Sequence, residues 1–332
     1  MISYAWQKQL DPRDRAEADA LVEEAARYDQ EAGFAAIGRT DVDSVSRPGE
    51  TVWHLPVKAR KDLSVAADAP LVMVAYLHLS IDTRGQGTIK YAVRPGYRAR
   101  GVSTLLVEEL GLDVQAPNGW CDTGATSLRC WAYGSHPASE RLTRRVDVRP
   151  VARLWTLLRH LTGPFAAPIV QAPTPGGVML EGPIDVQDTQ AQDSVGRVLV
   201  RAGRTHTQFE QLIGDLAERQ GQVLIASVSG RAVGFVWFDP ELVEHLELRT
   251  AWIRALVVIP DVRDGGLGSL LASCALNELK SATAQLALMR VDPADHSAVR
   301  MSRLLSFEQE DAHACYQIGE WIDPPAFAAE NL

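Results

Sequence analysis

The sequence predicts a mixed α/β fold that occurs twice along the chain. Strand-like runs alternate with segments of helical period in both halves. A strand, a proline, an arginine, a glycine and a Leu-Leu helix follow one another around Arg263, and the same order occurs around Arg98. The offset is 263 − 98 = 165 residues, almost half of the 332-residue chain. This indicates a duplicated domain, because solenoid repeats have periods of ~20–50 residues.

The first half is predicted to start with a helix and to continue with strands. Apolar residues recur at helical spacing over residues 9–31, and a polar stretch at 39–62 contains a short strand at 51–57. The apolar run at 71–80 is the strongest strand signal of this half. Further expected elements are a strand at 88–93, a helix after Gly101, a strand at 127–133, a helix at 136–145 and an extended segment at 147–158.

The second half is predicted to repeat this order after a linker. Residues 163–183 contain five prolines and a Gly-Gly pair, which favours a linker between domains at 1–162 and 184–332. The expected elements are helices at 190–202 and 207–219, a strand pair at 223–228 and 232–239, a strand at 253–259, a helix at 266–282, a strand at 285–291, a helix at 297–305 and a strand at 307–318.

The composition is that of a globular protein with a substantial core. Hydrophobic residues make up 46% of the chain and charged residues 23%. The net charge of −9 argues against nucleic acid or an anionic membrane as the main partner. The N-terminus has no secretion signal, and no apolar run approaches ~18 residues. The four cysteines form no C-x-x-C pair, and no histidine spacing indicates a metal site, so we expect a cytoplasmic protein without a bound metal.

The segment after residue 259 joins a strand to a helix through glycines. The start of such a helix presents unpaired N–H groups and the positive end of the helix dipole. Glycine lets phosphate oxygens approach the main chain, because no Cβ stands in the way. A P-loop is excluded by the missing Gly-Lys-Ser/Thr, and the proline before the glycines differs from a dinucleotide fingerprint. A pyrophosphate site is therefore predicted at Arg263, Asp264, Gly265, Gly266, Leu267, Gly268 and Ser269.

The order Arg-x-x-Gly-x-Gly resembles the acetyl-CoA loop of the GNAT acyltransferase superfamily, Arg/Gln-x-x-Gly-x-Gly/Ala. The β–α–β–α–β order after each copy is similar to the core of a GNAT domain. The resemblance implies two tandem GNAT domains with a mixed sheet, and acetyl-CoA as co-substrate. It also implies that the main chain of Leu256, Val257 and Val258 pairs with the pantetheine arm. In the first copy the matching cofactor candidates are Arg98, Gly101 and Ser103, with Ser103 replacing the second glycine.

Longer stretches are similar to the mycothiol synthase family of actinobacteria. They are Leu128 to Ala138, Gly234 to Trp237, Ala298 to Arg300, Leu305 to Phe307 and Ala314 to Tyr316. This resemblance implies a degenerate N-terminal domain and a catalytic C-terminal domain. The implied reaction is direct transfer of acetyl from acetyl-CoA to the cysteinyl amine of cysteinyl-glucosaminyl-inositol.

The same resemblance suggests catalytic residues and also shows departures. Tyr316 falls where the family carries its candidate general acid, since the helix at 297–305 has Met301 and Ser302 where relatives have a tyrosine. The family's basic glutamate corresponds to Trp252, which leaves Glu247, five residues earlier, as the candidate base. Pocket positions of the family fall on Asp295, Arg39 and Asp239.

Two alternatives stay open from the sequence. One is a GNAT enzyme for a different small-molecule amine, which the changed pocket residues favour. The other is a tandem module that binds CoA without transferring acetyl. The sequence does not give the oligomeric state.

Overall fold

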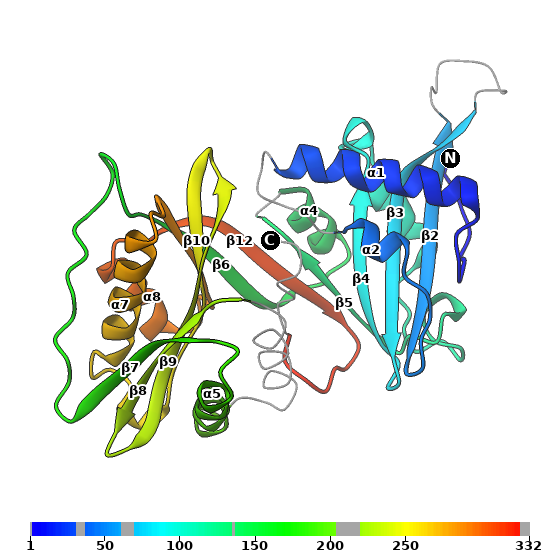
Figure 1. Cartoon of the computed structure of the whole chain (residues 1–332). Helices are drawn as coiled ribbons and strands as arrows, with labels where there is room; N and C mark the ends of the chain where they lie inside the picture. The colour runs from blue at the N-terminus through cyan, green and yellow to red at the C-terminus, as the bar shows by residue number, and fades with distance from the viewer. Residues whose placement is uncertain (1, 31–36, 61–69, 135–136, 204–219, 326–332) are drawn as a thin grey trace. The chain divides into compact units, whose positions relative to one another are not determined.

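The computed structural model describes residues 2–30, 37–60, 70–134, 137–203 and 220–325. The chain forms two compact units (Figure 1). Unit 1 comprises Met1–Arg153 and His313–Leu332, and unit 2 comprises Leu154–Ala312. Each unit contains a mixed sheet with helices packed against it, which confirms the predicted mixed α/β fold. No helix in the described ranges is long and apolar enough to cross a membrane.

The sheet of unit 1 has six strands in the order β1-β2-β3-β4-β5-β12. Neighbouring strands are antiparallel except β4 and β5, which are parallel. The strands are β1 (Ile2–Tyr4), β2 (Glu50–Arg60), β3 (Leu71–Asp82), β4 (Gln86–Val93), β5 (Ser127–Ala132) and β12 (Glu308–Ile318). The helices are α1 (Pro12–Gln30), α2 (Arg39–Val42), α3 (Val102–Leu110) and α4 (Pro137–Arg145).

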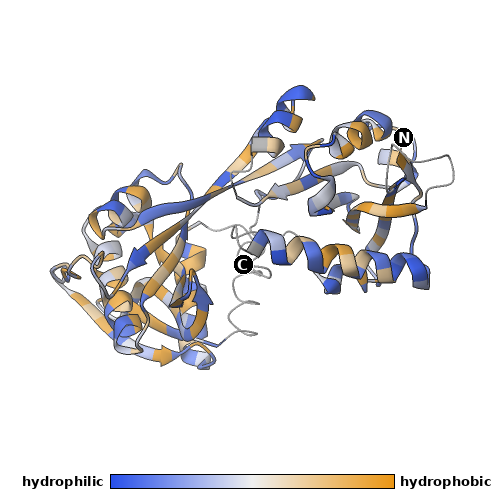
Figure 2. Ribbon diagram, turned by 90° about the horizontal axis from the view of Figure 1, so that it is seen from above, coloured by the Kyte–Doolittle hydropathy of each residue, from blue (hydrophilic) through white to orange (hydrophobic). Residues whose placement is uncertain are grey.

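Helix α1 forms because its apolar residues recur with helical period. Leu21, Val22 and Ala25 are buried in one cluster with Met73 and Tyr76 of β3. Burial of a leucine or valine side chain contributes about 1.5–3 kcal/mol, so this face fixes α1 on the sheet. Figure 2 shows hydrophobic and hydrophilic residues alternating along this long helix.

The sheet of unit 2 has the order β6-β11-β10-β9-β8-β7. Its strands are β6 (Pro150–His160), β7 (Val178–Asp185), β8 (Gln222–Val228), β9 (Arg231–His245), β10 (Leu248–Val258) and β11 (Leu286–Val291). Its helices are α5 (Thr189–Arg201), α7 (Leu267–Ser281) and α8 (His296–Leu304). The helix expected at 207–219 lies outside the described residues.

Strands β6 and β12 each pair with a strand of one unit, although the helix that precedes them in the chain belongs to the other unit. Strand β6 follows α4 of unit 1, but its residues 155–160 pair with β11 of unit 2. Strand β12 follows α8 of unit 2, but its residues 314–318 pair with β5 of unit 1. The units therefore differ from the expected ranges 1–162 and 184–332. Residues 154–162 and the linker belong to unit 2, and the end of β12 belongs to unit 1.

Helix α7 is the centre of the unit 2 core. Leu270, Leu271 and Leu276 are fully buried in a cluster that also contains Phe235 and Phe238 of β9. The apolar residues of α7 recur every three or four positions, as the sequence pattern predicted. This packing fixes the N-terminus of α7 at the end of β10.

Replacing Leu276 by alanine tests this packing. The side chain is 0% exposed, so we expect the free energy of unfolding of unit 2 to fall by about 2–5 kcal/mol. Urea unfolding followed by circular dichroism measures the change. Leu304→Ala in α8 is the matched control, because Leu304 is 72% exposed and its loss is expected to stay within about 0.5 kcal/mol. Equal losses would contradict the central role of α7.

Candidate active site

Strands β10 and β11 run in parallel and then part. Their ladder covers only Thr250–Ile253 of β10 and Leu286–Met289 of β11. Beyond this point β10 continues for five residues and pairs only with β9 on its other side. In the described part of the chain, no strand pairs with the open edge of residues 254–258. An extended ligand can therefore lie against this edge and use the main-chain groups that a strand would otherwise use.

The parting point coincides with irregular pairing between β10 and β9. One register shift falls between Thr250 and Trp252, and a second falls between Ile253 and Ala255. The second shift leaves Arg254 as an extra residue in β10. Bulges of this kind redirect a side chain and are frequent next to active sites.

The loop that follows β10 carries the predicted pyrophosphate residues. A short 3₁₀ turn at Pro260–Val262 leads to Gly266, whose φ of +83° is accessible to glycine at little cost. Gly266 precedes α7, and no side chain in the described residues is recorded as capping the first N–H groups of that helix. These groups and the helix dipole form a place for an anion. A Cβ on Gly266 would meet no atom within 4 Å, so the space above the loop is open.

The contacts of Arg263 and Gly268 explain why an arginine and a glycine occur at these two loop positions. The Nε of Arg263 donates to the carbonyl oxygen of Val258 at 3.1 Å, which ties the loop to the strand end. Its terminal nitrogens have no hydrogen bond or ion pair with any residue that the structure describes. A Cβ on Gly268 would lie 3.3 Å from the sulfur of Met301, so only a very small residue fits between α7 and α8.

The loop of the first copy has the same backbone geometry, but its arginine and the residue at the second glycine position have different partners. Arg98 Nε donates to the carbonyl oxygen of Val93 at 3.0 Å, and Gly101 has a φ of +79° before α3. However, Arg98 Nη2 donates to Asp29 Oδ2 at 2.8 Å, so an internal carboxylate neutralises this guanidinium. Ser103, in place of the second glycine, lies 3.1 Å from the Tyr91 hydroxyl. The structure thus places Arg98, Gly101 and Ser103 together, as their spacing implied.

Four polar or aromatic side chains meet at the parting point in unit 2. The indole of Trp252 contacts two arginines, with the guanidinium of Arg254 at 5.2 Å and that of Arg290 at 4.5 Å from the ring centroid. Arg254 Nη2 donates to Asp239 Oδ2 at 3.2 Å. Asp239 is 8% exposed and lies opposite Trp252 in the ladder. Sequence reasoning singled out Asp239 and Trp252 as departures from the family but did not connect them with the two arginines.

The two predicted catalytic residues belong to other parts of the chain. Glu247 is exposed in the two-residue turn between β9 and β10, where its φ is +61°. Glu247 lies seven positions before Arg254, which is about 23 Å of strand. Tyr316 belongs to the part of β12 that pairs with Cys130 in unit 1. The catalytic roles of Glu247 and Tyr316 stay predictions.

A second charged group lies at the far end of β9. His245 Nε2 and Glu310 Oε1 are within hydrogen-bonding distance, and this hydrogen bond raises the pKa of His245. Burial, together with the neighbouring Glu310, raises the pKa of Asp311 to about 6. His245 pairs with Leu248, so this group is six residues of strand away from Arg254. This charged group therefore lies near the turn after β9 and is not part of the loop Arg263–Ser269.

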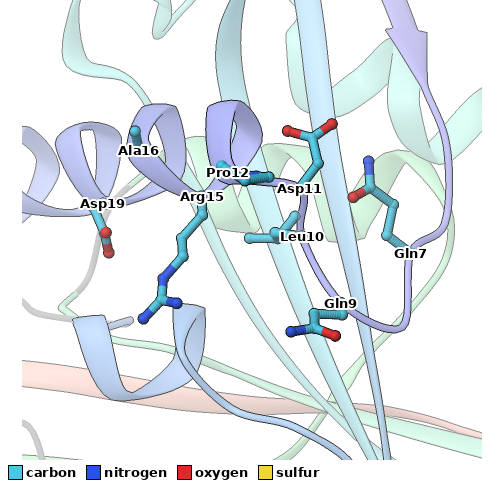
Figure 3. A pocket seen from close by; sticks show the side chains of 8 residues that line it. All are labelled: Gln7, Gln9, Leu10, Asp11, Pro12, Arg15, Ala16 and Asp19. Atoms are coloured by element: carbon cyan, nitrogen blue, oxygen red, sulfur yellow. The ribbon is translucent and has the colours of Figure 1, made fainter.

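A pocket of unit 1 lies beside the start of α1 (Figure 3). Figure 3 shows Arg15 pointing from α1 toward α2, and this side chain forms an ion pair with Asp43. The lining residues are Gln7, Gln9, Leu10, Asp11, Pro12, Arg15, Ala16 and Asp19. None of them is a candidate site residue. Over the described ranges, no group of three or more His, Cys, Asp or Glu side chains is arranged to hold a metal ion.

Sequence comparison relates the second half of the chain to a known family. The model described as the acetyltransferase (GNAT) family matches residues 191–307. A mycothiol acetyltransferase of Actinosynnema mirum is 29% identical over 96% of this chain and 100% of its own length. One of Salinispora tropica is 30% identical over 74% of this chain and 78% of its own length.

Solved structures show the same fold over the whole chain. A GCN5-related N-acetyltransferase of Sphaerobacter thermophilus matches with a TM-score of 0.59 at 18% identity, covering 95% of each chain. A tandem GNAT protein from the clavulanic acid biosynthesis pathway matches with a TM-score of 0.60 at 17% identity, covering 96% of this chain and 98% of its own. These likenesses confirm the prediction of two tandem GNAT domains.

Charging the loop tests where the anion binds. Gly266→Glu places a carboxylate in the open space above the loop, so we expect binding of acetyl-CoA to unit 2 and turnover to be lost. Titration calorimetry measures the binding. Gly101→Glu is the matched control, because its φ of +79° and its open surroundings impose the same backbone cost. Turnover that survives Gly266→Glu would show that the loop is misassigned.

Proposed function

The chain belongs to the mycothiol acetyltransferase family, and on this premise we propose that it acetylates the cysteinyl amine of cysteinyl-glucosaminyl-inositol. The protein is an acetyl-CoA-dependent N-acetyltransferase. One observation carries the assignment of the reaction to unit 2. The loop Arg263–Ser269, next to the open edge of β10, lies in the part of the chain that the GNAT family model matches.

The proposed roles of the cofactor residues follow from their positions. The N–H groups of Leu267, Gly268 and Ser269 at the start of α7 receive the pyrophosphate of acetyl-CoA. Arg263 contributes positive charge there through its terminal nitrogens, while its Nε keeps the loop on Val258. The main chain of residues 256–258 pairs with the pantetheine arm along the open edge.

The chemical step needs one proton acceptor and one proton donor. The acceptor amine is cationic near neutral pH and must lose a proton before its nitrogen attacks the thioester carbonyl carbon. The C–S bond then breaks, and an acid protonates the departing thiolate of CoA. Tyr316 is the proposed acid on the basis of its place in the family motif. A base at position 252 is excluded, because a tryptophan has no group that takes up a proton.

One observation favours a second candidate acceptor. The side chains at the parting point are Trp252, Arg254 and Arg290, together with Asp239. Two guanidinium groups and one carboxylate would suit an amine that carries its own negative group better than a polycation. A different small-molecule amine of this kind is the alternative acceptor. A cytoplasmic location is part of the proposal, since all four cysteines are free thiols.

Acetyl transfer to the cysteinyl precursor tests the proposed acceptor. We expect the precursor to be acetylated with a higher kcat/KM than a panel of amines that includes amino acids, glucosamine and polyamines. Release of free CoA thiol measures the rate. A higher kcat/KM for an anionic amine would favour the alternative acceptor. Binding of acetyl-CoA without transfer to any amine would contradict both.

Replacing the phenol of Tyr316 tests the proposed acid. Tyr316→Phe removes only the hydroxyl, so we expect kcat to fall by ~10²-fold or more while the affinity for acetyl-CoA is kept. Tyr91→Phe is the control, because it removes another tyrosine hydroxyl that is hydrogen-bonded in unit 1. An unchanged kcat for Tyr316→Phe would leave the tyrosine with a structural role in β12.

A further inference from the structure

The place of the reacting atoms follows from where β10 and β11 part. An arm that starts at the loop and follows the open edge of β10 meets the ladder between the two strands at Ile253. It cannot pass this point, because Ile253 and Met289 are paired there. The thioester at the tip of the arm therefore lies beside Arg254, the extra residue of the bulge.

Among the four side chains described at this point, Asp239 is the one that can take up a proton from an amine. The guanidinium groups of Arg254 and Arg290 have no acceptor site for a proton, and neither has the indole of Trp252. Asp239 is the carboxylate in hydrogen-bonding contact with this group, through Arg254 Nη2 at 3.2 Å. It lies directly opposite Trp252 in the ladder, so the two side chains are on the same face of the sheet.

Asp239 is also held in a defined orientation. Its Oδ1 accepts the backbone N–H of Glu241 at 3.0 Å, and its Oδ2 accepts the bond from Arg254. The register shift between Thr250 and Trp252 gives β9 two additional residues just after Asp239. A carboxylate fixed by two donors and only 8% exposed loses little rotamer freedom when a substrate arrives.

We propose that Asp239 is the catalytic carboxylate of unit 2 and that Arg254 positions it beside the thioester. The inference rests on the proposed acetyl transfer. Asp239 takes one proton from the ammonium of the acceptor. The amine nitrogen then forms a bond to the carbonyl carbon, the C–S bond breaks, and the electron pair leaves with the sulfur of CoA. The acid donates its proton to the thiolate and recovers one from the amine nitrogen, so that an amide and a free thiol result.

The assignment gives Trp252 and Arg290 a role as well. Arg290 on β11 and Arg254 on β10 contact the same indole ring from two strands, which joins the strands just before they separate. Arg254 contacts Asp239 directly, and Arg290 contacts the same indole ring as Arg254.

Asp239→Asn is the decisive variant, because the amide keeps the size and one acceptor oxygen but cannot take up the proton. We expect kcat to fall by ~10²-fold or more, with the affinity for acetyl-CoA unchanged in calorimetry. We also expect the pH profile of kcat/KM to change in shape, because the proposed proton acceptor is absent. A purely structural role would lower stability and leave the shape of the pH profile unchanged.

Three further variants complete the test. Asp239→Glu keeps the carboxylate and should retain more kcat than Asp239→Asn, which protects the test against a folding defect of the amide variant. Arg254→Lys keeps the charge but not the fork, so its kcat should fall less than that of Asp239→Asn. Glu241→Gln is the control, because only the backbone of Glu241 contacts Asp239, and its kcat should equal that of the natural chain.

The outcomes separate this inference from the proposed function. A natural chain that acetylates an amine while Asp239→Asn keeps full kcat overturns the assignment of Asp239 alone. A natural chain that binds acetyl-CoA and acetylates no amine overturns the transfer function and the assignment with it. Loss of kcat and a changed pH profile in Asp239→Asn, with acetyl-CoA binding retained, support both.

Discussion

The parting of β10 and β11 after Ile253 is the constraint on which the rest of unit 2 depends. A sheet strand without a partner exposes main-chain donors and acceptors that must be satisfied by another group. Helix α7, buried along its whole apolar face, keeps its own N-terminus at the end of that open edge. The separation of the two strands therefore leaves an open strand edge for an extended ligand and fixes where the far end of that ligand stops.

The duplication shows which features of the loop belong to the fold and which belong to the chemistry. Both arginines donate through Nε to the carbonyl five residues earlier, and both loop glycines have φ near +80°. The anchoring is therefore common to both units. What differs lies around it: Asp29 pairs with Arg98 in unit 1, whereas in the described chain the outer nitrogens of Arg263 are left for a ligand. The second copy is accordingly the better candidate for an anion site.

Local features could be predicted from the sequence, because they depend on neighbouring residues. The strand before Pro260, the glycine turn and the periodic helix at 267–281 are examples, and the repeat at 165 residues indicated two similar domains. Features that depend on distant pairing could not. The partners of β6 and β12, the early start of β10 at Leu248 and the bulge at Arg254 are set by strands far apart in the sequence. The contact of Asp239 with Arg254 depends on that bulge and was missed for the same reason.

The exchange of β6 and β12 has a consequence for dividing the protein into its halves. Strand β12 follows most of unit 2 in the sequence and covers the edge of β5, so the first half expressed alone leaves this edge uncovered. An uncovered edge is a template for pairing with other chains. We therefore expect that neither half folds as an independent module, because a shortened chain would expose an unpaired strand edge that promotes aggregation.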